Sequence, residues 1–199
     1  MSNVSFSQKE ADRLMKIPGT QKGAVLRSHL AAIKNHAGEE GLAKIEKALV
    51  ELGYPVTLQE VRATKEYPEA QTALISLLCQ KLLGYTDADI FVQAVEASKL
   101  SFFSQLLMRT FTSLERVLKN APHYWKKHVS IGDLECSEFN KKEKFAIIRL
   151  RNYKLHPVVC LSLAGYFVGM FRYVQPSANI KETKCIHKGD QYHEFKVTW

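Results

Sequence analysis

The sequence predicts an α+β fold: an N-terminal helical part followed by a β-β-α-β-β unit with a four-stranded antiparallel sheet. Apolar residues recur at helical spacing through residues 1–128, and the spacing then changes to two. One nearly continuous apolar stretch separates two predicted hairpins. Strands that follow helices, rather than alternate with them, favour an antiparallel sheet. No repeat or linker interrupts the chain, so we expect a single domain over 1–199, with a helical part (1–128) and a sheet with a buried helix (129–199).

The helical part contains six predicted helices. They cover residues 7–16, 21–38, 39–53, 67–84, 87–98 and 99–122. Ser7 and Glu10 have the spacing of a capping box at the first of them. Gly38 and Gly53 each follow a helical stripe and are expected to end it. The last helix is the longest, and we expect it to end at Pro122.

The remaining third contains two hairpins around one helix. Residues 133–151 read as strand, polar turn and strand, and the stretch 156–174 reads as a helix that is apolar nearly all round and therefore central. Its uninterrupted apolar run has 14 residues, short of the roughly 20 that a membrane span needs. Gly165 and Gly169 predict close packing of this helix on the sheet.

The closing hairpin lies in residues 181–199, and its register decides which side chains face inward. A two-residue turn would pair Cys185 with Glu194. A three-residue loop, Lys188 to Asp190, pairs Cys185 with His193, and we favour it because it forms two opposite-charge pairs on one face. These pairs are Lys184 with Glu194 and Glu182 with Lys196.

Cys185 and His193 would then face each other on the buried side of the hairpin. Thiolate and neutral imidazole are zinc ligands, so this pair is half of a metal site. In this register Glu182 points to the opposite face, and Cys136 or Cys160 would have to approach from elsewhere. The alternative is a buried thiol beside a hydrogen-bonded core histidine.

Aromatic and apolar residues gather near the junction of the helices and the sheet. They predict a cavity for a small hydrophobic ligand, and plain core packing is the alternative. The residues that we expect to line the cavity are Phe103, Leu107, Phe111, Tyr124 and Trp125.

The chain carries a net charge of +8, which favours an anionic partner. The densest basic stretch, residues 119–154, is the candidate surface for nucleic acid or an acidic protein. No signal peptide begins the sequence, and four widely spaced cysteines suggest reduced thiols and a cytoplasmic location. No catalytic or nucleotide-binding motif occurs, so we expect no enzyme.

Three stretches resemble one known superfamily. They are KGAVLRSHLAAIKNHAGEEGLAKIEKALVELG (22–53), FAIIRLRNYKLHPVVCLSLAGYFVGMFRYV (145–174) and ETKCIHKGDQYHEFKVTW (182–199). The first resembles the opening of haem nitric-oxide-binding (H-NOX) domains. The other two resemble the strand, buried helix and closing hairpin shared by H-NOX domains, 4-vinyl-reductase-type (V4R) domains and TRAPP core subunits.

The resemblance implies a ligand-binding sensor fold and a homodimer formed through the N-terminal helices. H-NOX haem binding uses a proximal histidine and a Tyr-x-Ser-x-Arg motif. This chain has no such motif and no histidine in residues 111–119, so haem is not expected. V4R-type regulators can bind zinc through cysteines near the tail, and His193 stands where their second cysteine would be. Zinc therefore remains open, and no other cofactor is expected.

We therefore expect a non-enzymatic sensor or adaptor domain. It would bind a small hydrophobic molecule or a partner signalling protein. One alternative is a basic interaction module for nucleic acid or an acidic partner, and the other is a metal- or haem-dependent sensor.

Overall fold

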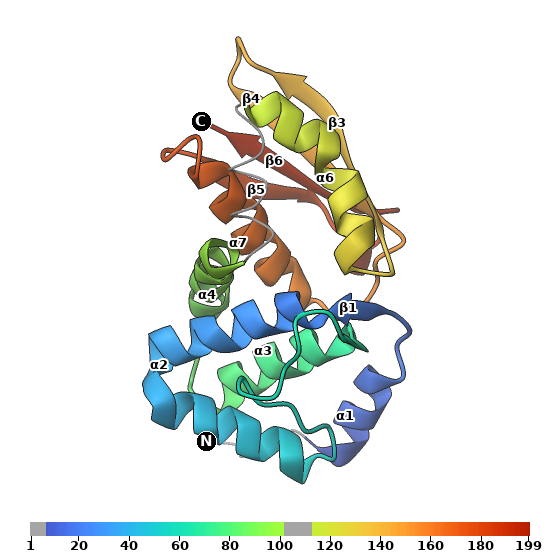
Figure 1. Ribbon diagram of the computed structural model, residues 1–199. Helices are drawn as coiled ribbons and strands as arrows, with labels where there is room; N and C mark the ends of the chain where they lie inside the picture. The colour runs from blue at the N-terminus through green and yellow to red at the C-terminus, as the bar shows by residue number, and fades with distance from the viewer. Residues whose placement is uncertain (1–6, 102–112) are drawn as a thin grey trace.

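The computed structural model describes residues 7–101 and 113–199 and confirms the α+β class (Figure 1). Its helices are α1 (Gln8–Met15), α2 (Gly23–Glu51), α3 (Ala70–Leu82), α4 (Asp87–Leu100), α6 (Leu114–His128) and α7 (Val158–Arg172). Its strands are β1 (Thr20–Lys22), β2 (Glu66–Pro68), β3 (Asp133–Asn140), β4 (Phe145–Arg151), β5 (Asn179–Lys184) and β6 (His193–Thr198), and a 3-10 turn, η1, covers Ile186–Lys188.

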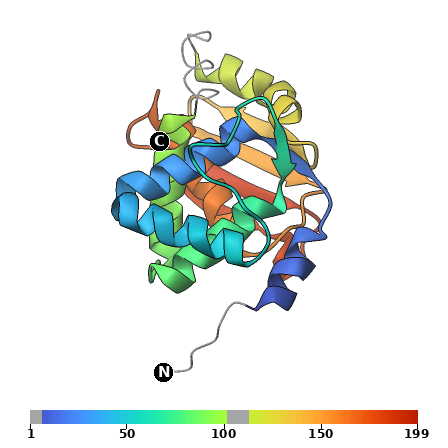
Figure 2. The ribbon, with the colours of Figure 1, turned by 60° about the horizontal axis from the view of Figure 1, so that its bottom comes forward.

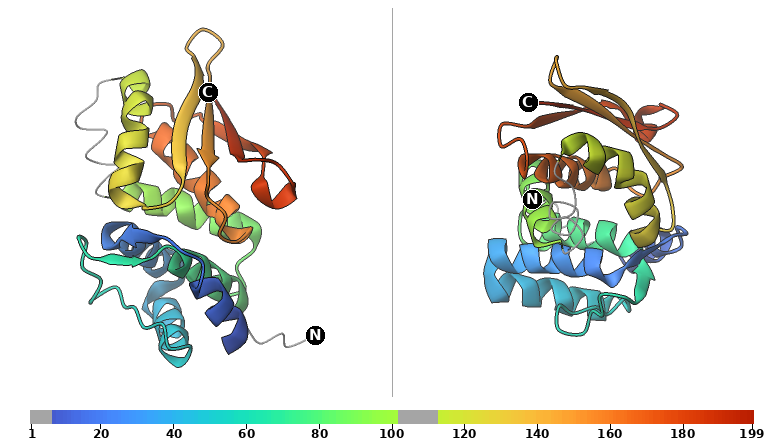
Figure 3. Two further views of the ribbon diagram at one scale, coloured as in Figure 1. Left: turned by 90° about the vertical axis from the view of Figure 1, so that its right-hand side faces the viewer. Right: turned by 45° about the horizontal axis from the view of Figure 1, so that its top comes forward.

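The elements form layers. The four-stranded sheet is at one end, α6 and α7 lie on one of its faces, and α1, α2 and α3 form the opposite end (Figure 3). Helix α4 packs on α7 and α2 and so joins the two ends. Figure 2 shows the helical end from the side that faces away from the sheet. Within the described ranges, no helix is long and apolar enough to span a membrane.

The sheet has the order β3-β4-β6-β5 and is antiparallel throughout. Both predicted hairpins are present. The inward residues of β4 are buried at every second position, as the period of two predicts. The central strand pair joins the two hairpins, since β4 lies next to β6 and not next to β5. A two-stranded sheet of β1 and β2, which we did not predict, closes the helical part beside α6.

The predicted helix boundaries hold at some positions and fail at others. Ser7 and Glu10 form the capping box. Gly38 ends the first helical stretch, as predicted, because its φ of +72° and ψ of −178° are non-helical. A second helical stretch follows it across a kink, and both belong to α2. Pro68 pairs with Thr20 in the small sheet instead of opening a helix, because its fixed φ suits an edge strand.

Pro122 was wrongly expected to end a helix. It lies inside α6, which begins after Ser113 and continues to His128. The helix persists past the proline because Val117, Leu118 and Trp125 on either side of it pack into the core. Tertiary burial here outweighs the missing backbone donor.

Helix α7 is central, as predicted, with ten buried residues along 15 positions. Its two glycines, however, face α4 and not the sheet. A Cβ on Gly165 would overlap the Phe91 carbonyl and lie 2.8 Å from the Ala94 Cβ. A Cβ on Gly169 would overlap Ser98. The glycines thus let two helix backbones approach closely.

Candidate metal centre

The closing hairpin adopts a register that differs from the predicted one at a single bulge. Lys184 faces Glu194, as predicted, but Glu182 faces Phe195 and not Lys196. Thr183 is the extra residue, and its hydroxyl donates to the carbonyl and a carboxylate oxygen of Glu194. A one-residue slip moves a side chain to the other face of a sheet, so Glu182 turns inward. The predicted outward Glu182–Lys196 pair is therefore wrong.

The loop of this hairpin is also longer than the predicted three residues. It runs from Cys185 through the 3-10 turn to Tyr192, and Gly189 ends that turn with a φ of +100°. Asp190 accepts a hydrogen bond from the Cys185 backbone N–H at 2.8 Å. This bond holds Cys185 with its thiol toward the interior, where the side chain is 2% exposed.

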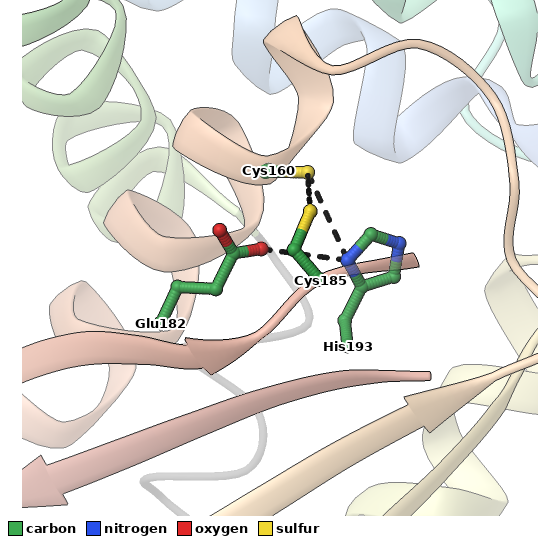
Figure 4. A group of neighbouring side chains, drawn as sticks. All are labelled: Cys160, Glu182, Cys185 and His193. Carbon is green, nitrogen blue, oxygen red and sulfur yellow. Dashed lines mark hydrogen bonds and ion pairs between the residues drawn. The ribbon is translucent and has the colours of Figure 1, made fainter. Parts of the chain in front are cut away.

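Four side chains that can ligate a metal meet at this loop (Figure 4). Cys160 comes from the first turns of α7, Glu182 from the end of β5, Cys185 from the loop and His193 from the start of β6. One ligand atom of each lies within 4.8 Å of those of the others. The cluster therefore joins the buried helix to both strands of the closing hairpin.

The orientation of His193 suits metal binding. Its Nε2 lies 3.0 Å from the Tyr153 carbonyl, which can only accept a hydrogen bond. Nε2 therefore carries the proton, and Nδ1 presents a lone pair toward Cys160 and Glu182. A backbone acceptor on the far ring nitrogen is the usual support of a metal-bound histidine.

Three of the six separations between the ligand atoms match the edges of a zinc tetrahedron. Ordinary zinc bonds set two sulfurs roughly 3.8 Å apart, sulfur and nitrogen roughly 3.6 Å, and nitrogen and oxygen roughly 3.3 Å. The corresponding separations are 3.6 Å for Cys160 Sγ to Cys185 Sγ, 3.8 Å for Cys160 Sγ to His193 Nδ1, and 3.4 Å for His193 Nδ1 to Glu182 Oε1. The remaining three separations are each no more than 4.8 Å.

The electrostatics of the cluster favour a cation. Burial raises the pKa of the Cys160 thiol well above its usual range, and the negative charge of Glu182 raises it further. A bound divalent ion removes both penalties, because it supplies positive charge next to the thiolate. An open cleft of about 370 Å³, lined also by His156 and His187, leads from solvent to the cluster.

The structure thus brings together the two metal-site residues that the sequence predicted, Cys185 and His193. It also adds two ligands. Cys160 is one of the two cysteines that the sequence offers from outside the hairpin, and Glu182 lies on the face opposite to the predicted one. The sequence did contain a signal that Cys160 could lie near the hairpin, since its helix was predicted to be central. No sequence pattern indicated the bulge that turns Glu182 inward.

Three of the predicted cavity residues, Phe103, Leu107 and Phe111, lie outside the described residues. Tyr124 and Trp125 are half-buried on α6. Trp125 borders an apolar cavity of about 70 Å³ between α6, α7 and the sheet. Its walls include Leu118, Leu134, Ile148, Phe167, Met170 and Phe171.

Trp125 and Tyr124 also border a second cavity of about 70 Å³, on the side of the helical part. Gln21 and Glu69 reach it from the small sheet and the start of α3, and the Tyr153 hydroxyl donates to Glu69 Oε1 at 2.6 Å. No sequence pattern indicated this second cavity, because its residues come from six separate segments.

The buried carboxyl group of Glu69 should give the free energy of unfolding an unusual dependence on pH. Burial raises its pKa to about 7 from 4.5, although the Tyr153 hydrogen bond acts the other way. Between these values the folded chain holds one more proton than the unfolded chain, so this contribution to stability falls as pH rises. The pKa difference corresponds to about 3 kcal/mol. Relative to the wild type, Glu69→Gln should therefore gain about 3 kcal/mol in free energy of unfolding between pH 4.5 and pH 8.

Denaturant unfolding of both proteins across this range measures the difference. Burial lowers the pKa of His29 to about 4, which gives the opposite slope, but His29 is present in both proteins and cancels. A difference between the two proteins that stays constant with pH would contradict the assignment.

The basic stretch 119–154 is partly neutralised by acids. Lys126 pairs with Asp133, Arg149 with Glu194 at 2.7 Å, and Arg151 with Glu135 at 3.1 Å. A nucleic-acid or acidic-protein surface there stays a prediction.

Comparison with known proteins gives similarity in structure but not in sequence. No family model matches the chain, and no curated protein matches it. An H-NOX protein from S. oneidensis, in the Fe(II)NO ligation state, has a TM-score of 0.65 at 12% identity, over 88% of this chain and 97% of the other. An unliganded Fe(II) H-NOX protein from K. algicida has a TM-score of 0.61 at 12% identity, over 89% and 95%.

A third structure, an H-NOX variant designated Tt, has a TM-score of 0.65 at 11% identity and covers 89% of this chain. The predicted likeness to V4R and TRAPP proteins stays a prediction. At these identities the similarity concerns the path of the chain and not its residues. This protein has the H-NOX fold over nearly its whole length.

Proposed function

We propose that this protein is a non-enzymatic, metal-dependent sensor or adaptor domain that binds one zinc ion through Cys160, Glu182, Cys185 and His193. The observation that carries the proposal is the convergence of these four ligand atoms within 4.8 Å. The H-NOX fold supports a sensor role, since similar structures are described by the state of a bound ligand.

Zinc suits this ligand set better than other common ions. Two thiolates exclude the hard ions Mg²⁺ and Ca²⁺, which take oxygen ligands. The mixture of sulfur, nitrogen and oxygen at tetrahedral spacing is typical of zinc. Four protein ligands leave no position for an activated water, so the ion would be structural or regulatory and not catalytic.

The ion would tie three elements together. Cys160 belongs to α7, whereas Glu182 and His193 belong to the two strands of the closing hairpin. Binding or loss of the ion would change how the loop from Cys185 to Tyr192 is held. A change at this surface loop is a signal that a partner protein could detect.

Native mass spectrometry of the purified protein tests the proposal. We expect one zinc ion per chain, and its loss in Cys185→Ser and His193→Ala. Cys136→Ser is the matched control, because Cys136 lies on β3 outside the cluster. Cobalt substitution should add thiolate-to-metal absorption in the wild type and in the control alone. A wild-type chain that takes up no zinc or cobalt from a stoichiometric solution would rule out the metal site.

A small hydrophobic ligand is the second candidate, and the apolar cavity beside Trp125 supports it. The same mass measurement would detect a retained organic molecule and the oligomeric state. Homodimerisation, the cytoplasmic location and a partner protein stay predictions.

Haem is implied by the fold, because similar structures are described by the redox potential and the distortion of their haem. The described residues do not fit it. The cavities at the junction measure about 70 Å³ each, whereas pockets for much smaller, drug-sized ligands measure roughly 300–1,000 Å³. The rings of Trp125, Tyr153 and Phe167 pack against one another there. We therefore assign no step of the function to haem, and visible absorption of the purified protein tests this.

A further inference from the structure

The second cavity holds two buried polar atoms without a partner. Within the described part of the chain, Gln21 Oε1 and Glu69 Oε2 are buried and accept no hydrogen bond. Both side chains line the cavity, and the residues are 1% and 4% exposed. Unpaired buried acceptors are rare in folded proteins, so a pair in one cavity calls for a ligand.

The neighbours fix the orientation of the Gln21 amide. Its Nε2 lies 2.7 Å from the Thr72 hydroxyl and 3.3 Å from the Pro68 carbonyl. The carbonyl can only accept, so the nitrogen must lie on that side. The amide oxygen is therefore directed away from both partners, and a flipped amide would set two acceptors against each other.

The charge balance of the cavity is one-sided. Among its described lining residues Glu69 is the only acid, and none is Lys or Arg. Tyr153 satisfies one carboxylate oxygen and leaves the other unpaired. Burial lowers the pKa of His29, so this histidine is neutral near pH 7 and supplies no positive charge. A buried carboxylate requires a cation or a proton.

The walls of the cavity are suited to an organic cation. Trp125, Tyr124 and Tyr166 line it, and aromatic faces attract ammonium groups. Val25, Val159 and Leu163 offer contact for a short carbon chain. The volume of about 70 Å³ corresponds to roughly five water-sized positions, which sets the size of the occupant.

We infer that this cavity is a binding site for a small primary ammonium ion, whose N–H groups donate to Glu69 Oε2 and Gln21 Oε1 and whose short alkyl chain contacts the aromatic wall. The site is separate from the metal cluster, which lies on the other side of Tyr153. The Tyr153 hydroxyl bonds Glu69, and its carbonyl bonds His193.

The test is titration calorimetry of the full chain with n-propylammonium chloride at constant ionic strength. Saturable binding of one ion per chain is expected. Neither n-propanol, a neutral probe of equal size, nor sodium propionate, an anion of similar size, should bind. Glu69→Gln should weaken binding roughly ten- to hundredfold, because it removes a charged hydrogen-bond partner. Glu66→Gln is the matched control and should bind like the wild type, since Glu66 is exposed and pairs with Lys22.

A second measurement keeps the inference testable if Glu69→Gln does not fold. The ammonium ion requires the ionised carboxylate, so wild-type affinity should rise by about tenfold from pH 6 to pH 8. Other titratable groups lining the cavity are His29, His128, Tyr124, Tyr153 and Tyr166. Burial holds the pKa of Tyr153 well above this range, and binding of an anion or a neutral probe would not show the same rise.

Two results would overturn the inference. One is propanol binding as tightly as propylammonium, which would indicate a cavity that takes water or any small polar molecule. The other is propylammonium binding that does not saturate or does not change with pH. Neither result would bear on the metal centre, because zinc content is measured independently.

Discussion

Removal of zinc by a chelator is expected to lower the melting temperature of this protein by about 10 °C. An ion present at a thousand times its dissociation constant stabilises the folded chain by about 4 kcal/mol. For a chain of this size, that free energy corresponds to roughly 8–16 °C. We expect a large effect because the proposed ion would join a core helix to both strands of the closing hairpin, and the unfolded chain cannot hold these ligands together.

Differential scanning calorimetry with and without chelator measures this shift. In Cys160→Ser the chelator should change the melting temperature by less than about 2 °C. This variant lacks one of the four zinc ligands, so it holds no ion for the chelator to remove. Cys136→Ser should keep the full wild-type shift. A wild-type melting temperature that is identical with and without chelator, in protein shown to contain zinc, would mean that the ion does not stabilise the fold.

Gly165→Val is expected to lower the free energy of unfolding by about 3 kcal/mol. Replacement of glycine by a larger residue in a helix usually helps, by up to about 1 kcal/mol. Here the first added carbon would overlap the Phe91 carbonyl and approach the Ala94 Cβ. A backbone carbonyl inside a helix cannot move aside, so α4 and α7 must separate and lose buried contact.

Ala164→Val is the matched control. It adds a β-branched side chain at the preceding position of the same helix, where the residue is half-buried. We expect a change of less than about 1 kcal/mol there. Chemical denaturation of both variants measures the contrast. Equal destabilisation by the two substitutions would mean that helix propensity, and not the α4–α7 contact, determines the cost.

The strands could be predicted from the sequence more accurately than the contacts between elements. The period of two located both hairpins, and the apolar stretch from Val158 located the central helix, because these signals are local. The predicted packing partner of Gly165 and Gly169, the sheet, was wrong for a physical reason. Small residues indicate close approach, but the sequence does not say whether a sheet or a helix approaches.

The metal cluster shows the same division. Alternation along β6 placed His193, Phe195 and Val197 on the buried face, and all three are buried. The inward turn of Glu182 depends on one extra residue, Thr183, which no pattern of charge or hydropathy announces. The approach of Cys160 depends on how α7 packs over the hairpin.

The sequence by itself therefore determined the α+β class, the β-β-α-β-β order of the last third and the inward side of the last strand. These follow from the periodicity of apolar residues, which reports burial directly. Only the tertiary structure decided which side chains meet: the four ligands around Cys185, and the unpaired Glu69 and Gln21 in their cavity. Such sites combine residues from distant segments, and their geometry depends on packing between elements rather than on any local preference.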